Sequence, residues 1–267
     1  MKHRALWLTV LAFAAWTAPA SPARAQAKVT PANAVEKPKA DEAAAPQLLP
    51  TVKEILAKFE AASGDRAQWK KFTSRQARGF FQTEDAAIFG GIEILSKAPD
   101  KVFMKVSLPG NLLLREVCDG KSAWVEDPFG GVQELTGVSL QDRIRRADFY
   151  GSASAILFRS TGKVLGTGRV GTHMVYIVQS SPREGLVEKI YFDVDSGLVV
   201  REDMIAESED GPVVVENYLD DYRQVDGIRI PFRMRRVEKG AVFTIRLTQL
   251  RHNVPVDDAL FQKRLSP

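Results

Sequence analysis

The amino-acid sequence predicts a mainly β (α+β) protein in which about eleven or twelve antiparallel strands form a strongly curved sheet or a barrel. Three observations support this expectation. After Ser74, apolar and polar residues alternate over many short segments. Gly, Pro, Asp or Asn separates these segments. Helical spacing of apolar residues is confined to one stretch before them and one stretch between them.

The first 25 residues predict export. Lys2 and Arg4 precede an apolar run over residues 5–15, and Ala23 and Ala25 are the small residues at alternate positions that a signal peptidase recognises. The run is shorter than the roughly 20 apolar residues that a bilayer core requires. We therefore expect residues 1–25 to be a signal peptide, cleaved after about Ala25, and the mature protein to be periplasmic.

The charge balance argues against a nucleic-acid partner. The chain has 37 basic and 33 acidic residues, and three of the basic residues lie within 1–25, which leaves 34 basic residues against 33 acidic ones. Such a balance gives no broad surface for a polyanion. Charged residues recur throughout the rest of the chain, so we expect no transmembrane segment in the mature protein. Cys118 is the only cysteine, which excludes an intramolecular disulfide.

The folded part is expected to begin near Thr51. Residues 26–50 are rich in Ala, Pro and Lys, and we expect them to form a disordered linker because they cannot bury enough apolar surface to offset their ordering entropy. Residues 51–267 are expected to form one domain. Thr51 and Glu54 match a capping box, and Gly64 is a suitable C-terminal cap. The apolar residues between them recur at helical spacing: Val52, Ile55, Leu56, Phe59 and Ala62.

Alternating segments predict five strands after this helix, at residues 76–82, 89–97, 102–108, 112–118 and 122–126. Ile92 and Ile94 share a face opposite Glu93, and Met104 and Val106 share a face opposite the neighbouring lysines. One face of the sheet is therefore apolar, and the other is polar and exposed to solvent. The alternation leaves open whether the apolar face is an open cavity or a filled core.

A helical insertion is expected over residues 139–160. Leu140, Ile144 and Ala147 can line one side of a short helix, and a second apolar cluster at 155–158 includes Phe158. Strands then resume at residues 164–169, 173–179, 187–192, 198–206, 213–220, 228–235 and 242–250. The sequence at 195–197, Asp-Ser-Gly, has the residues of a tight hairpin turn.

The segment 119–124, Asp-Gly-Lys-Ser-Ala-Trp, is followed by Asp-Pro-Phe at 127–129 and resembles a hairpin of the LolA-like superfamily of periplasmic outer-membrane lipoprotein-sorting and carrier proteins. The Lys-Ala-Pro sequence at 97–99 and the closing segment at 254–261 resemble the same family. The resemblance covers roughly residues 49–261. One departure is Ala98, because the carriers tend to have arginine immediately before this proline.

The resemblance implies a half-open antiparallel β-barrel, covered by the N-terminal helix and the helical insertion, that binds lipid or lipoprotein acyl chains in an apolar cavity. Such a ligand needs apolar surface rather than catalytic groups, because its methylenes contribute about 0.8 kcal/mol each on burial. The expected lining residues come from the predicted strands and the helical insertion: Ile92, Ile94, Met104, Val106, Leu112, Leu114, Trp124, Ile144 and Phe158.

Other chemistry is set aside on sequence grounds. The glycines at 166–171 have dinucleotide-binding spacing, but a β-rich segment follows them where a helix is required, so we expect a hairpin. His173 and His252 have no histidine or cysteine nearby at metal-ligand spacing, and Cys118 is expected to be a buried or half-buried thiol rather than a nucleophile. We therefore expect no metal, no cofactor and no enzyme activity. The alternative is an envelope-stress or protein-interaction module that binds an envelope membrane-protein partner with the same barrel.

Overall fold

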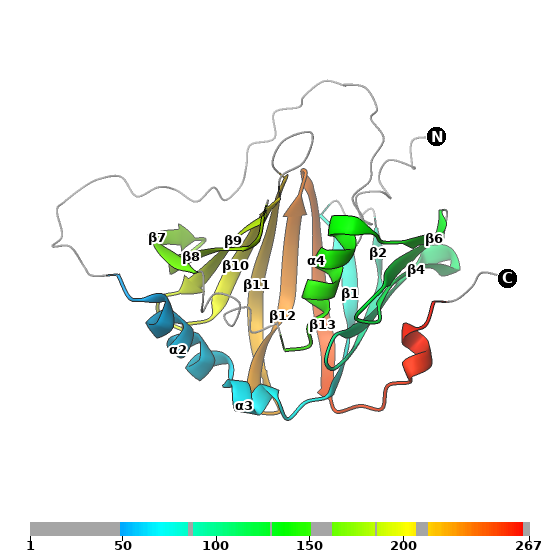
Figure 1. The fold of residues 1–267 in the computed structure, drawn as a ribbon, viewed down its shortest axis with the longest axis horizontal. Coiled ribbons are helices and arrows are strands. Elements are labelled where there is room, and N and C mark those ends of the chain that lie inside the picture. The colour runs from blue at the N-terminus through cyan, green and yellow to red at the C-terminus, as the bar shows by residue number, and fades with distance from the viewer. Residues whose placement is uncertain are drawn as a thin grey trace, which may run out of the picture.

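The computed structural model describes residues 49–84, 88–128, 130–150, 162–184, 186–206 and 213–263. The expected signal peptide at 1–25, nearly all of the expected linker at 26–50, and Phe158 in the second half of the insertion lie outside the described residues. Among the described residues, the structure is a single curved sheet with short helices (Figure 1).

The sheet has thirteen antiparallel strands in the order β6-β5-β4-β3-β2-β1-β13-β12-β11-β10-β9-β8-β7. The strands are β1 (Ser74–Thr83), β2 (Phe89–Lys97), β3 (Lys101–Leu108), β4 (Leu112–Cys118), β5 (Ala123–Asp127), β6 (Gly131–Glu134), β7 (Lys163–Val170), β8 (His173–Arg183), β9 (Leu186–Asp193), β10 (Val199–Ala206), β11 (Val213–Val225), β12 (Ile228–Glu238) and β13 (Ala241–His252). Two meanders, β1–β6 and β7–β13, are joined where β1 pairs with β13. Because β6 and β7 lie at opposite edges, the barrel is half-open.

The sequence pattern predicts twelve of these strands. Strand β6 was not predicted because its four residues, Gly-Val-Gln-Glu, are too few and too exposed to show alternation. The glycine-rich segment at 166–171 is confirmed as part of the β7–β8 hairpin. The hairpin turn between β9 and β10 is confirmed too, with Gly197 at a φ of 75°, a conformation that favours glycine. The carboxylate of Asp193 accepts the backbone N–H of Ser196 in this turn, at 2.6 Å.

Helix α2 (Val52–Ser63) begins as the sequence predicts. The Thr51 hydroxyl accepts the Glu54 backbone N–H at 3.3 Å, and the Glu54 carboxylate accepts the Thr51 backbone N–H at 2.7 Å. The helix buries Ile55, Leu56 and Phe59 against the strands from β8 to β11. Its position over one side of the curved sheet is visible in Figure 1. A four-residue helix that was not predicted, α3 (Arg66–Trp69), follows it and buries the Trp69 side chain.

Helix α4 (Gly137–Ala147) is the first half of the predicted insertion and lies within the curve of the sheet, in front of β13 and β1 (Figure 1). Its predicted apolar side, with Leu140, Ile144 and Ala147, packs against a small cluster that includes Cys118 and Val125. The short helix η2 (Pro109–Asn111) joins β3 to β4. The helix η3 (Asp258–Phe261) covers the outer face of β2–β5, because its Phe261 packs among outward-facing side chains of those strands.

Candidate functional site

A cavity of about 440 Å³ lies between the concave face of the sheet, α2 and α4. Its size falls within the range of about 300 to 1,000 Å³ that is typical of small-molecule sites. Residues of both meanders line it, so the curvature of the whole sheet creates the space. The apolar walls include Phe59 of α2, Ile94 of β2, Met104 of β3, Ile190 of β9, Leu219 of β11 and Met234 of β12.

Two of the predicted lining residues, Ile94 and Met104, line this cavity. Four others share the apolar face but lie in a filled cluster beside it: Ile92, Leu112, Val106 and Leu114. The ring centroids of Phe81 and Phe243 lie 5.3 Å apart in this cluster, and the two rings fill space beside these residues. The sequence alone did not determine whether this space is a cavity or a filled core. For those four residues the structure therefore shows a packed core rather than an open wall.

The prediction that Trp124 lines the cavity is wrong. Trp124 lies on the outer face, where it packs with Val117 and Phe261. The inward-facing residues of β5 are its neighbours Ala123 and Val125. The segment after β13 covers the indole ring of Trp124 on the outer face of the sheet. Apolar side chains are therefore buried on both faces here, and the apolar character of Trp124 does not show which face it lies on.

The two predicted residues of the insertion have different outcomes. Ile144 is half-buried and packs from α4 onto the Cys118 cluster, not into the cavity. Phe158 lies outside the described residues.

Charged side chains that sequence reasoning missed form one end of the cavity. Arg143 of α4 pairs with Glu116 of β4, and Arg145 pairs with Glu188 of β9 at 2.6 Å. The Glu116 side chain is 2% exposed and that of Glu188 is 9% exposed, so both carboxylates lie inside the molecule. Helix α4 is thereby tied to both meanders. The sequence did hold an indication, because Glu116 alternates in register with Leu114 on the apolar face of β4.

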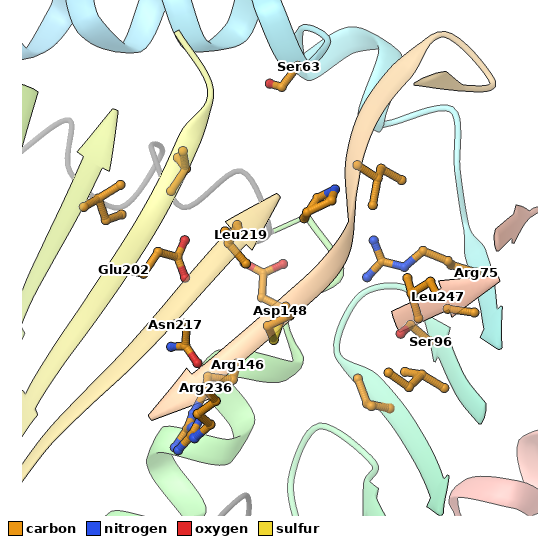
Figure 2. A pocket seen from close by; sticks show the side chains of 18 of the residues that line it. Ser63, Arg75, Ser96, Arg146, Asp148, Glu202, Asn217, Leu219, Arg236 and Leu247 are labelled. Atoms are coloured by element: carbon orange, nitrogen blue, oxygen red, sulfur yellow. The ribbon is translucent and has the colours of Figure 1, made fainter. Parts of the chain in front are cut away.

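Four further arginines line the cavity: Arg75 of β1, Arg146 of α4 and Arg236 of β12, which Figure 2 labels, and the exposed Arg229 of β12. Burial lowers the pKa of Arg75 to about 10, and its guanidinium lies over the ring of Phe149, with 5.4 Å between the guanidinium carbon and the ring centroid. Burial and the like charge of Arg236 lower the pKa of Arg146 to about 10. Both groups remain charged at neutral pH.

The fold is similar to that of several solved structures. A LolA superfamily protein from Nitrosomonas europaea is 16% identical with a TM-score of 0.52, over 80% of this chain and 99% of that chain. A DUF1329 family protein from Desulfovibrio piger is 15% identical with a TM-score of 0.55, over 79% of this chain and 97% of that chain. A domain from Vibrio parahaemolyticus described as outer membrane lipoprotein-sorting is 11% identical with a TM-score of 0.51, over 78% of this chain and 94% of that chain.

The fold of this chain is LolA-like. No family model matches the sequence, and no curated protein matches it. At these identities the likeness describes the fold alone.

The arginines of the cavity come from β1, β12 and α4. Ala98, at the position where the carriers tend to have arginine, packs in the apolar cluster around Trp69 and Phe72. The guanidinium on this side of the cavity comes instead from Arg75, one strand away, whose backbone pairs with Ser96 of β2. Apolar walls with charged groups at two places suit a ligand that is mostly hydrocarbon and has a polar end.

Neither metal binding nor membrane crossing by a helix has support among the described residues. They contain no group of three or more His, Cys, Asp or Glu side chains placed to hold a metal ion. Within the same part of the chain, none of the helices combines the length and the apolar character that crossing a membrane requires.

Proposed function

We propose that this protein binds the acyl chains of a lipid or of a lipid-modified protein in the cavity of the half-open barrel, and carries them through the periplasm. The single observation that supports this proposal most is the cavity itself. Side chains of the described residues do not fill the space between the sheet and the helices, although both meanders contribute apolar side chains to its walls. A folded interior of this kind is normally close-packed, so an open apolar space of about 440 Å³ is best explained by a ligand.

The energetics fit an acyl chain. An acyl chain of about 16 carbons gains on the order of 12 kcal/mol from burial of its methylenes, before the cost of its ordering is subtracted. This gain requires only contact with apolar walls, so the proposal assigns no catalytic residue to the protein. One similar structure is described as a lipoprotein-sorting domain, which supports a carrier. The apolar run at residues 5–15, which belongs to the expected signal peptide, supports the periplasm.

Native mass spectrometry of the purified mature protein, followed by lipid extraction and titration of the delipidated protein with a fluorescent fatty acid, tests the proposal. We expect a co-purified amphiphile and saturable uptake of the probe. Finding neither would count decisively against a lipid carrier.

A pair of variants locates the binding. Met234→Trp places an indole ring in the cavity from a half-buried wall position, and it should abolish uptake. Val214→Trp adds the same ring at an exposed position on β11, and it should bind the probe as the wild type does. Equal binding by the two variants would place the probe outside the cavity.

A pair of exposed aromatic rings supports the alternative function, which is that of a protein-interaction module. Phe80 and Phe89 are 46% and 49% exposed on neighbouring strands, and their ring centroids lie 5.5 Å apart. Exposed apolar side chains that lie together are typical of contact sites. Crosslinking in cells distinguishes the two functions, because a stoichiometric protein partner on a protein with an empty cavity would support the alternative.

A further inference from the structure

Arg146 has unused hydrogen-bonding capacity inside the cavity. A guanidinium has five N–H donors. That of Arg146 donates one hydrogen bond, from Nε to the backbone oxygen of Asp142 at 3.4 Å. Among the described residues, no carboxylate lies within ion-pairing distance of Arg146. The side chain is exposed and lines the cavity, so its remaining N–H donors can reach a ligand there.

Arg236 brings a second positive charge to the same place. It is 4% exposed, and its Nη2 donates to the carboxylate of Glu238 at 2.8 Å. Figure 2 shows Arg146 and Arg236 lying together at the end of the pocket beside α4. Desolvation by the surrounding protein and, after it, the charge of Arg236 lower the pKa of Arg146, while the carboxylates of Glu116 and Asp142 oppose this shift. Glu238 already pairs with Arg236, so an anion bound here would mainly offset the charge of Arg146, and Arg236 would add a second positive charge nearby.

Asn217 completes the arrangement. It pairs with Arg236 across β11 and β12, so their side chains share the concave face as direct neighbours. Asn217 is 8% exposed and lines the cavity, and its amide offers two further N–H donors. Glu202 lies one strand further away, next to Asn217 on β10, so the acidic side of this row lies away from Arg146.

We infer that the ligand of this cavity carries an oxyanion headgroup, a carboxylate or a phosphate, which Arg146 and Arg236 bind with help from Asn217 while the hydrocarbon lies against the apolar walls. This inference rests on the proposed function and specifies its ligand. Planar guanidinium groups suit both oxyanions because each can donate two parallel hydrogen bonds. The walls with Ile94, Met104 and Leu219 accommodate the remainder of the ligand.

The test compares two probes with the same chain on the delipidated mature protein: a fluorescent hexadecanoic acid, which is anionic at neutral pH, and its methyl ester, which is neutral. The wild type should bind the acid more tightly. Arg146→Gln should weaken binding of the acid by about 10- to 100-fold, the effect expected for loss of a hydrogen bond to a charged group, and leave binding of the ester unchanged. Arg146→Lys should restore part of the loss because it restores the charge without the second parallel donor.

Arg233→Gln is the matched control. Arg233 lies on β12 like Arg236, but it is exposed and pairs with Asp220. It should bind both probes as the wild type does. Circular dichroism and urea denaturation establish that each variant is folded before its affinity is interpreted.

The outcomes separate this inference from the proposed function. Equal binding of acid and ester by the wild type, with no effect of Arg146→Gln, would overturn the headgroup site and leave acyl binding intact. A loss of acid binding in Arg75→Gln but not in Arg146→Gln would overturn the assignment to Arg146. Binding of neither probe would overturn both proposals.

Competition identifies the source of the oxyanion. A lysophosphatidic acid of the same chain length should displace the fluorescent acid, and inorganic phosphate at the same concentration should not. If inorganic phosphate competes as well as the lipid, the site binds a free anion, and the inference of an amphiphile is wrong.

Discussion

At the scale of single residues, the buried pair of Arg143 and Glu116 shows that the position of a residue on a strand can determine its burial more than its residue type does. Charged side chains are seldom fully buried unless they are paired. Here Glu116 falls on the apolar face of β4 because the strand alternation puts it there, and Arg143 reaches it from α4. The pair places charge beside the hydrocarbon walls of the cavity.

Removal of one member of this pair should be strongly destabilising. In Arg143→Met the Glu116 carboxylate stays buried without its counter-ion, and we expect the free energy of unfolding to fall by about 3–5 kcal/mol in urea denaturation. Adding Glu116→Gln to this variant should recover part of the loss. Lys97→Met is the control, because Lys97 and Asp258 form an exposed pair that contributes no more than about 1 kcal/mol. Similar losses in the two single variants would contradict the prediction.

His252 should make stability depend on pH. Burial lowers its pKa below the ordinary 6.5, Arg75 adds to this effect, and a hydrogen bond to Asp226 at 2.9 Å opposes it. The unfolded chain therefore takes up a proton at a higher pH than the folded protein does. Stability is complete above about pH 6.5 and falls as the pH drops toward the folded pKa, by at most about 1.4 kcal/mol per pH unit.

Urea denaturation of the wild type and His252→Gln at about pH 7.5 and pH 5.5 measures this effect. Other carboxylates titrate in both proteins, so the difference between the two pH dependences isolates His252. The wild type should lose more stability than the variant on acidification. Parallel curves would show that His252 has the same pKa in both states.

At the scale of elements, local patterns in the sequence predict most of the strands and the start of α2. The β2 and β4 boundaries coincide with those expected from alternation. Local patterns do not determine what lies against each face. Trp124 was assigned to the wrong face because the Phe261 segment that covers it is distant in the sequence. The Arg146 and Arg236 site was missed because it forms only when α4 packs across the concave sheet.

The capping box should hold α2 in place over the cavity. In Thr51→Ala the Glu54 backbone N–H loses its side-chain acceptor, and we expect the free energy of unfolding to fall by about 1 kcal/mol. Hydrogen exchange should show faster opening of the first turn of α2. Thr51→Ser keeps the hydroxyl and should behave as the wild type does. If Thr51→Ala has the free energy of unfolding and the hydrogen exchange of the wild type, packing of Ile55, Leu56 and Phe59 alone determines where the helix starts.

At the scale of the whole molecule, the cavity connects two halves of one sheet. The pairing of β1 with β13 joins the meanders, and α4 bridges them through Glu116 on one side and Glu188 on the other. A ligand in the cavity would contact both halves as well, since Met104 belongs to the first and Ile190 to the second. Ligand binding should therefore stabilise the molecule as a unit.

This linkage can be measured by unfolding the delipidated mature protein in urea with and without the fatty acid. At a free ligand concentration of about 100 times Kd, the free energy of unfolding should rise by about 2.7 kcal/mol, because the ligand binds only the folded state. Hydrogen exchange should slow in β3 and in β9 together, because both strands line the cavity. Met234→Trp should abolish both effects. Protection confined to one meander would mean that the ligand binds one half of the sheet alone, and the open space between the halves would then need another explanation.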